Sequence, residues 1–393
     1  GQQASISLLA NLGYSLATMK FSRTFIVLAC VLASAFALSH VPQTSKNVAL
    51  APSSKGLVEV DLVGESQSQL AQDAVPVRGG MTEDMQARLK VGVYFGLWYA
   101  LNIGYNIYNK KALNAIPAPW TVATMQMVAG VFLFVPMWLL GIRKAPKLSM
   151  EDIKTLFPIG TMHTLSHVSA VISLGAGAVS FTHIVKAAEP LFTALFSAVL
   201  LGQFFAWQVY TTLIPVIVGV ALASLKELSF SWTSFGGAMT SNVASALRGV
   251  FAKTSMSGKP VGENMNASNL YSVLTLMACT LLIPVALLLE GKGFKSAWNT
   301  AVATSGADGR TIGLWTLLSG LYYYSYNEVA FLALDSVHPI THAVGNTIKR
   351  VVIIITSIIV FKTEMTTLGA IGSAIAILGV LAYSLAKNAY DKK

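Results

Sequence analysis

Charged side chains are scarce in this chain of 393 residues. Asp, Glu, Lys and Arg make up 11% of it, against about 25% in a soluble globular domain. Hydrophobic residues make up 54%, and the mean hydropathy is +0.62. This balance excludes an ordinary soluble protein. It predicts a polytopic membrane protein whose charges are confined to loops and to a few special positions.

Cysteines and carboxylates are also few. Of the two cysteines, Cys30 falls in a leader that we expect to be removed, so Cys279 has no intrachain disulfide partner. The net charge of +10 comes from dispersed basic residues, which indicates contact with anionic lipid rather than nucleic acid. No Walker A loop, nucleophile elbow or metalloprotease motif occurs, so we expect neither an enzyme nor a cofactor.

The first part of the chain is typical of a targeting sequence. Residues 19–35 hold a basic start, a short apolar run and an Ala-Ser-Ala cleavage site, which predicts a secretory signal peptide. Residues 36–58 lack acidic side chains, as transit peptides do, and residues 59–88 are a polar linker. Residues 1–18 precede the first Met and are expected to be a non-native or gene-model extension. This leader resembles that of proteins entering diatom-type complex plastids; an ordinary secreted or endomembrane leader is the alternative.

Residues 89–388 are expected to form an all-α domain of ten transmembrane helices, followed by a tail at 389–393. A span needs about 20 mainly apolar residues. The stretches of this kind are 90–109, 120–141, 155–175, 179–201, 207–225, 232–252, 269–289, 311–333, 340–361 and 366–387. An even number of spans places both ends on one side. Lys and Arg are more frequent in the loops of that side, which predicts the stroma of a plastid.

The fourth and ninth expected spans share a short motif. Phe-Thr-His-Ile-Val at 181–185 matches Ile-Thr-His-Ala-Val at 340–344, and basic residues follow both copies, Lys186 in one and Lys349 and Arg350 in the other. Five spans separate the copies. This odd offset predicts two inverted five-helix halves, at about 89–226 and 231–388. Inverted repeats place the substrate site near the membrane midplane, between the halves.

The buried cations predict an anionic substrate. Each cation near the bilayer centre costs at least about 2.5 kcal/mol, so Lys186, Lys349 and Arg350 need a polar cavity or anions. Phosphate suits them because it accepts the forked donors of Arg and the mobile charge of Lys. We therefore predict a transporter with a central cationic site. The alternative is snorkelling or pairing with an intramembrane carboxylate, namely Glu189, Glu328 or Asp335.

Other polar residues inside the expected spans are candidates for supporting roles. His163 and His167 share one helix face, but no Cys or carboxylate nearby completes a metal site. We expect no metal there, and expect His167 to line the cavity. The Tyr326 hydroxyl is suited to bonding a phosphate, with aromatic packing as the alternative. Arg248 is expected to lock helices together, with Glu328 as its partner; Glu328 as a proton site is the other interpretation.

At these residues the chain resembles the plastid phosphate translocators of the drug/metabolite transporter superfamily over about residues 88–388. The motifs that carry the resemblance are 179–190, 339–350, Asn109-Lys110-Lys111, and Ser241-Asn242 with Arg248. The resemblance implies strict antiport of inorganic phosphate against a phosphorylated C3, C5 or C6 compound. It also implies that Lys186, Lys349 and Arg350 clamp the phosphate, and that Tyr326 and His167 contact the substrate.

Within the family, Tyr326-Asn327 and residues 341–346 resemble the triose-phosphate branch. We therefore expect triose phosphate or 3-phosphoglycerate as the exchanged cargo, moved by alternating access across a plastid envelope membrane. Ala170 and Ser245 depart from the branch pattern, which has a hydroxyl and an aromatic residue there. Exchange of phosphoenolpyruvate or a sugar phosphate therefore stays open. A nucleotide-sugar transporter of the same fold and a passive anion channel are further alternatives.

Overall fold

The computed structural model describes residues 83–225, 227–256, 261–336 and 339–390. The predicted signal peptide, the transit peptide and nearly all of the linker lie outside the described residues, as do the last three residues of the tail. Residues 87–393 cluster as one unit, which contains the expected membrane domain.

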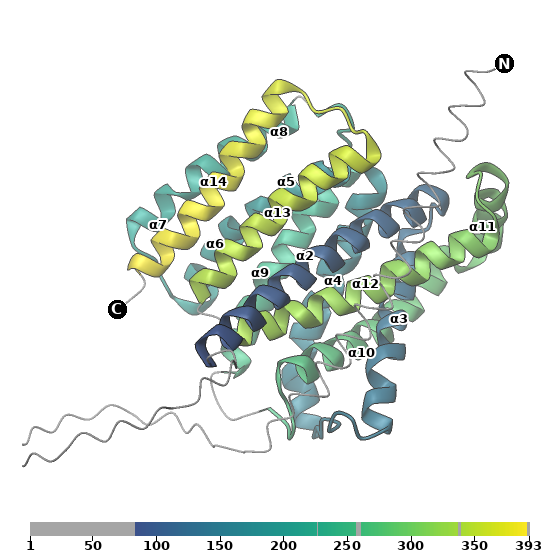
Figure 1. Ribbon diagram of the computed structural model, residues 1–393, viewed down its shortest axis with the longest axis horizontal. Coiled ribbons are helices and arrows are strands. Elements are labelled where there is room, and N and C mark those ends of the chain that lie inside the picture. The colour runs from purple at the N-terminus through teal and green to yellow at the C-terminus, as the bar shows by residue number, and fades with distance from the viewer. Residues whose placement is uncertain (1–82, 226, 257–260, 337–338, 391–393) are drawn as a thin grey trace, which may run out of the picture. The chain divides into compact units, whose positions relative to one another are not determined.

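The described residues form helices and no β-strand beyond one isolated bridge (Figure 1). In chain order the helices are α2 (Glu83–Ala115), α3 (Pro119–Leu139), α4 (Met150–Ala176), α5 (Val179–Val185), the 3₁₀ turn η1 (Lys186–Ala188), α6 (Glu189–Leu201), α7 (Trp207–Thr211), α8 (Leu213–Leu225), α9 (Trp232–Met256), α10 (Ala267–Ala286), the π turn η2 (Leu287–Gly291), α11 (Lys292–Thr304), α12 (Gly309–Ser336), α13 (Pro339–Phe361) and α14 (Thr367–Tyr390). Every expected span overlaps one of these helical segments.

Six helical segments among the described residues are long and apolar enough to cross a membrane. They are Pro119–Leu139, Val179–Leu201, Trp207–Leu225, Ala267–Thr304, Val344–Phe361 and Thr367–Tyr390. The protein is therefore an all-helical membrane protein. The other long helices, α2, α4, α9 and α12, carry many of the buried polar side chains, including Asn106, His167, Ser241 and Ser319. Polar residues within a bundle lower the hydropathy of a segment and mark an interior face.

The fourth expected span is broken rather than continuous. Pro190 stands in the first turn of α6, where it lacks an N–H and its ring opposes the carbonyl of residue 186. The chain responds with the 3₁₀ turn at Lys186–Ala188, in which the Glu189 N–H bonds the Lys186 carbonyl. The sequence Lys-Ala-Ala-Glu-Pro thus places Lys186 at the start of a break between two helices.

The start of α4 shows how the sequence ends a loop and begins a helix. The Ser149 side chain accepts from the Asp152 N–H, and the Asp152 carboxylate accepts from the Ser149 N–H and hydroxyl. This capping box satisfies backbone donors that the first turn leaves free. The bonds from Ser149 hold the pKa of the Asp152 carboxyl below its usual value.

Small residues set the closest helix contacts. Helices α8 and α14 pack along a seam in which a Cβ added to Gly219 would lie 2.3 Å from the Ala376 nitrogen. A Cβ at Gly372 would lie 2.6 Å from the Ala223 nitrogen. Glycine and alanine at such positions let two backbones approach within van der Waals contact, which drives helix association in membranes.

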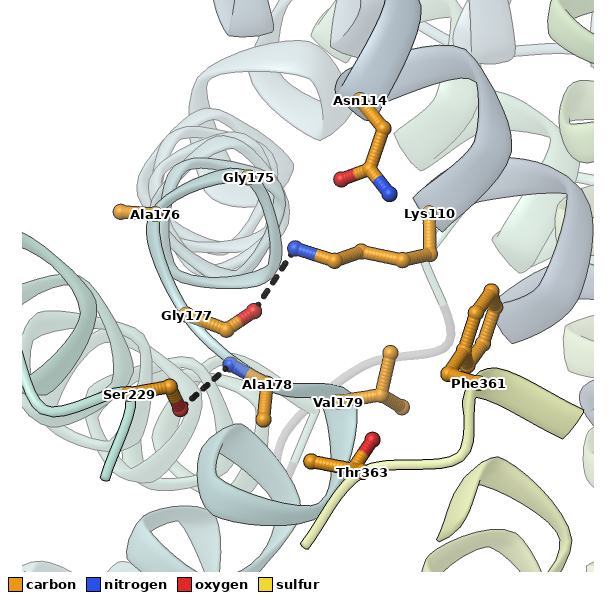
Figure 2. A pocket seen from close by; sticks show the side chains of 10 residues that line it. All are labelled: Lys110, Asn114, Gly175, Ala176, Gly177, Ala178, Val179, Ser229, Phe361 and Thr363. Atoms are coloured by element: carbon orange, nitrogen blue, oxygen red, sulfur yellow. Dashed lines mark hydrogen bonds between the residues drawn. The ribbon is translucent and has the colours of Figure 1, made fainter. Parts of the chain in front are cut away.

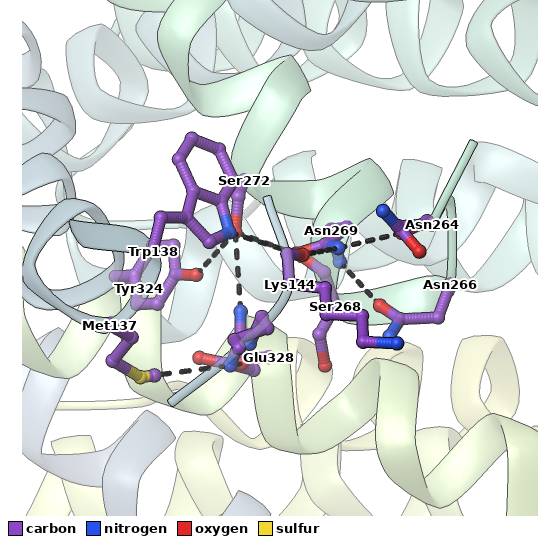
Figure 3. Close-up of polar contacts among 11 residues, drawn as sticks. Met137, Trp138, Lys144, Asn264, Asn266, Ser268, Asn269, Ser272, Tyr324 and Glu328 are labelled. Atoms are coloured by element: carbon purple, nitrogen blue, oxygen red, sulfur yellow. Dashed lines mark hydrogen bonds and ion pairs between the residues drawn. The ribbon is translucent and has the colours of Figure 1, made fainter. Parts of the chain in front are cut away.

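Helices α3 and α10 are joined at one end by their adjoining loops. Lys147 and Glu263 form an antiparallel backbone bridge with N···O distances of 3.1 and 3.0 Å. Figure 3 shows the neighbouring network, in which the Asn269 amide donates to the Lys144 carbonyl at 2.9 Å and its oxygen accepts from the Trp138 indole at 3.0 Å. These bonds link segments about 120 residues apart in sequence.

A carboxylate joins the same two helices at their other end. The Glu290 oxygens accept from the Trp120 N–H at 3.1 Å and from the N–H and hydroxyl of Thr121 at 2.7 and 2.8 Å. A negative side chain at a helix N-terminus satisfies free donors and interacts favourably with the helix dipole. Helices α3 and α10 are thus tied together at both ends.

Candidate substrate site

Lys186 lies in the break between α5 and α6 and is held by a neutral oxygen. Its Nζ donates to the Ser241 Oγ of α9 at 2.6 Å. Ser241 itself is fully buried. A hydroxyl orients the ammonium without neutralising its charge. This contact therefore adds no negative charge beside Lys186.

Arg350 is paired with a carboxylate. Its Nη2 donates to the Glu189 Oε2 at 3.3 Å, which links α13 to the first turn of α6. The Arg350 side chain is buried and the Glu189 side chain is half-buried. The pairing alternative considered from the sequence is therefore confirmed for Arg350, with Glu189 as the partner.

Lys349 rests on an aromatic face. Its Nζ lies 4.7 Å from the ring centroid of Trp98 in α2. The same indole also contacts His342, whose ring stacks at 5.0 Å with an interplanar angle of 16°. A cation–π contact stabilises an ammonium by about 0.5 to 2 kcal/mol and leaves its charge uncompensated.

Among the described side chains, one carboxylate lies within electrostatic range of all three cations. Glu189 interacts electrostatically with Lys186, Lys349 and Arg350, and also with Arg248 of α9. The His183 imidazole lies within electrostatic range of the same three predicted cations, and its Nε2 is bonded to the Asn106 amide oxygen at 2.9 Å. Among the described side chains, the cluster holds more basic than acidic groups.

Arg248 and Glu328 are not partners, so the predicted helix lock between them is wrong. The Arg248 Nη1 donates to the His163 Nδ1 at 3.0 Å. Glu328 of α12 pairs instead with Arg143 from the α3–α4 loop (Figure 3). The reason is that the loop folds back onto α10 and α12, and Arg143 also contacts Ser272 there. The Asp335 side chain lies outside the described part of the chain.

Tyr326 and His167 both contact the same aromatic residue, Tyr323. The Tyr326 ring packs 5.6 Å from Tyr323 and 5.4 Å from Tyr105. The His167 ring lies 4.1 Å from Tyr323. Sequence reasoning missed Tyr323 and Tyr105, although the run Leu-Tyr-Tyr-Tyr-Ser-Tyr at 321–326 placed aromatic rings on several faces of that helix. His163 and His167 point to different partners.

Ala170 and Ser245 lie on α4 and α9, whose backbones pack closely along their length. The Ser245 Oγ is 2.6 Å from the Ser166 Oγ, so its hydroxyl is used in the contact between these helices. Both Ala170 and Ser245 are half-buried.

A separate cavity of about 430 Å³ lies at the ends of α2, α4 and α13 (Figure 2). The Lys110 Nζ points across it and donates to the carbonyls of Leu174 and Gly177, both at 2.8 Å. A cation at these carbonyls stabilises the C-terminal end of α4. The lining residues are Lys110, Asn114, Gly175, Ala176, Gly177, Ala178, Val179, Ser229, Phe361 and Thr363. None of them belongs to the cation cluster.

Comparisons with known proteins place this geometry in a family. Residues 89–384 match the Triose-phosphate Transporter family. The chain is 43% identical over 301 residues to glucose-6-phosphate/phosphate translocator 1, chloroplastic, of Arabidopsis thaliana, covering 76% of each chain. It is 40% identical over 318 residues to phosphoenolpyruvate/phosphate translocator 2, chloroplastic, of the same plant, covering 80% of this chain and 82% of that one.

A third relative is the triose phosphate/phosphate translocator, chloroplastic, of Flaveria trinervia, which is 40% identical over 327 residues, covering 83% of this chain and 78% of that one. These relatives are phosphate translocators by name, and the resemblance found in the sequence motifs is confirmed. The chain belongs to the triose-phosphate transporter family.

Proposed function

We propose that the protein is a secondary antiporter that exchanges inorganic phosphate for a phosphorylated carbon compound across a plastid envelope membrane. One observation carries the proposal: among the described side chains, Lys186, Lys349 and Arg350 lie within electrostatic range of one carboxylate, that of Glu189, and only Arg350 is paired with it. A buried excess of positive charge is stable only with an anion or water beside it. The relatives supply the chemical class, because each name pairs phosphate with an organic phosphate.

In this proposal Lys186, Lys349 and Arg350 bind the phosphate group, which accepts several charge-assisted hydrogen bonds at once. Lys186 and Lys349 are free to do so because their contacts are neutral, a hydroxyl and an indole ring. Tyr326 and His167 contact the carbon part of the cargo. Both rings pack on Tyr323, and together these residues form an aromatic surface.

Ten transmembrane helices in two inverted halves are the proposed architecture. The helix contacts support it, because they occur in pairs related by an offset of five spans. The contact of α3 with α12 corresponds to that of α4 with α10, and the contact of α5 with α8 corresponds to that of α13 with α14. The contact of α3 with α4 likewise corresponds to that of α10 with α12.

The contacts of α9 depart from this symmetry, and the pair α4 and α9 supports alternating access. Helices α4 and α9 pack backbone to backbone, whereas the equivalent pair α2 and α12 is spaced by aromatic rings. In the second pair Tyr105 contacts Tyr323, and Tyr108 stacks on Tyr322 at 5.7 Å. If the two halves exchange these arrangements, access moves from one side of the membrane to the other.

The charge of the site accounts for obligate exchange. Closing the empty site would strip water from unpaired cations, which is costly. Bound phosphate supplies the missing negative charge and makes the closed state accessible. The protein then changes sides only when it carries cargo, so inward and outward transport are coupled.

Triose phosphate and 3-phosphoglycerate remain the first candidates for the carbon cargo, on the resemblance at Tyr326-Asn327. A larger sugar phosphate is the second candidate. Two observations favour it: the short side chains of Ala170 and Ser245 between α4 and α9, and 43% identity to a glucose-6-phosphate/phosphate translocator.

Counter-exchange in liposomes tests the proposal. Vesicles loaded with phosphate are offered triose phosphate, 3-phosphoglycerate, phosphoenolpyruvate or glucose 6-phosphate, and uptake is measured with and without internal phosphate. We expect uptake only against internal phosphate, and its loss in Lys349→Ala. The matched control is Lys295→Ala, at an exposed lysine of α11, which should exchange normally. Normal exchange by Lys349→Ala would exclude the proposed site, and uncoupled voltage-dependent current would favour a channel.

A further inference from the structure

The helix break at Lys186 leaves one backbone carbonyl without its usual donor. In a continuous α-helix the Val185 carbonyl would accept from the Glu189 N–H. Here the Glu189 N–H bonds the Lys186 carbonyl instead, because Pro190 cannot donate to it. The Val185 carbonyl is buried inside the bundle, where an unpaired carbonyl is costly.

A side chain from the other half of the protein satisfies this carbonyl. The Asn242 Nδ2 of α9 donates to the Val185 carbonyl at 2.9 Å. Asn242 is fully buried, so water does not substitute for its amide. The amide thereby stabilises the 3₁₀ turn that starts at Lys186.

The neighbouring residue on α9 holds the end of the Lys186 side chain. The Ser241 Oγ accepts from the Lys186 Nζ at 2.6 Å and donates its own proton to the Ser166 carbonyl at 2.8 Å. Because its proton is used on Ser166, the Ser241 oxygen presents a lone pair to the ammonium. Lys186 is thus fixed at both its backbone and its tip by two adjacent residues.

Helix α9 is itself held rigidly where it does this. A Cβ added to Gly237 would lie 2.8 Å from the Ser169 carbonyl of α4, so the two backbones are in direct contact. The Ser173 hydroxyl of α4 donates to the Ser234 carbonyl of α9 at 2.7 Å, and Ser234 lies two helical turns before Ser241. Close small-residue contacts and serine hydrogen bonds fix the rotation of α9 against α4.

We propose that Ser241 and Asn242 are positioning residues for the phosphate site, which hold Lys186 in the orientation that phosphate requires. This rests on the proposed function, since it assumes that Lys186 binds phosphate. It adds that residues of the second half of the protein orient Lys186, a phosphate-binding residue of the first half. A binding side chain that is held by a neutral acceptor has no counter-charge to give up when the substrate binds. It also loses little conformational freedom on binding.

The test compares Ser241→Ala, Asn242→Ala and Ser241→Thr with the wild type in phosphate counter-exchange. Losing one hydrogen bond to a charged group corresponds to about tenfold in affinity. We expect Ser241→Ala and Asn242→Ala to raise the KM for phosphate about tenfold, with kcat changed by less than about threefold. Ser241→Thr keeps the hydroxyl and should restore most of the affinity.

Ser234→Ala is the matched control, because it removes another buried hydroxyl from the same α4–α9 contact. It should lower the midpoint of thermal unfolding as much as Ser241→Ala does, and leave the KM for phosphate unchanged. Equal KM values in Ser241→Ala and Ser234→Ala would overturn the inference while leaving phosphate exchange itself intact.

A second readout does not depend on transport. The rate at which a small acylating reagent modifies Lys186 is followed by mass spectrometry in the detergent-solubilised full chain. We expect faster modification in Ser241→Ala than in Ser234→Ala, because the amine is no longer held by the hydroxyl. Equal rates in the two variants would contradict the positioning role. Absence of phosphate exchange in the wild type would instead contradict the proposed function.

Discussion

The three clustered cations differ in what they contact. Lys186 bonds a hydroxyl and Lys349 lies on an indole, whereas Arg350 bonds the Glu189 carboxylate. Under the proposed function, phosphate adds a partner to the two lysines but competes with Glu189 for Arg350. Glu189 therefore limits how tightly phosphate binds, and stabilises the site when phosphate is absent.

Glu189→Gln tests this competition. The amide is similar in size and removes the negative charge, so we expect the KM for phosphate to fall about three- to tenfold. The phosphate-free protein should unfold at a lower temperature, because Arg350 loses its charged partner. Exchange kinetics and thermal unfolding with and without phosphate measure the two effects. An unchanged or higher KM would show that Glu189 does not compete with the substrate.

At the scale of helices, the sequence located the expected spans but not all the breaks in them. The break between α5 and α6 has a local cause in Pro190, because proline removes one backbone donor, although we expected residues 179–201 to form one continuous span. Helix α11, in contrast, lies in residues that we expected to be a loop. Its few apolar residues include Phe294 and Trp298, which pack against the main hydrophobic core. Packing with residues distant in sequence stabilises this helix, so local hydropathy alone did not predict it.

Glycine substitutions in two helices should have opposite effects. Gly219→Ala places a Cβ 2.3 Å from the Ala376 nitrogen and forces α8 and α14 apart, which we expect to cost about 1 to 3 kcal/mol of stability. Gly249→Ala on α9 meets nothing within 4 Å, and should stabilise by about 0.5 to 1 kcal/mol through helix propensity. Thermal unfolding in detergent compares the stabilities of the two variants. A change in stability of the same sign in both would contradict the packing of α8 on α14.

At the scale of the whole molecule, the two proposed halves are tied together at both ends of α3 and α10. The α3–α4 and α9–α10 loops form the bridge of Lys147 with Glu263, and Glu290 caps α3 at the other end. A pair of helices fixed at both ends is suited to be the part about which other helices move. The exposed ion pair between the Lys147 and Glu263 side chains, at 2.9 Å, contributes less than the backbone bridge because solvent screens it.

The proposed orientation places the termini and the α3–α4 loop on the stromal side. Single cysteines at two exposed loop positions, Lys144→Cys and Asp308→Cys, test it in a chain with both native cysteines replaced. In sealed vesicles, a membrane-impermeant maleimide should label Lys144→Cys from the same side as a C-terminal tag, and Asp308→Cys from the other side. Labelling of both positions from one side would exclude the proposed topology.

The sequence by itself determined the class of protein, the family and the main cationic residues. These follow from local properties: apolar runs long enough to span a bilayer, a proline that breaks a helix, and charges too costly to bury without a function. The family match over residues 89–384 confirmed the resemblance that those motifs carried.

Only the tertiary structure decided which groups meet. The pairing of Arg350 with Glu189 joins residues 161 positions apart, and that of Arg143 with Glu328 joins residues 185 positions apart. Helical periodicity indicates which residues share a face, but the close packing of α4 on α9 and the fold of the α3–α4 loop determine which faces come into contact. For that reason Arg248 was assigned the wrong partner, and the hold of Ser241 and Asn242 on Lys186 emerged only from the structure.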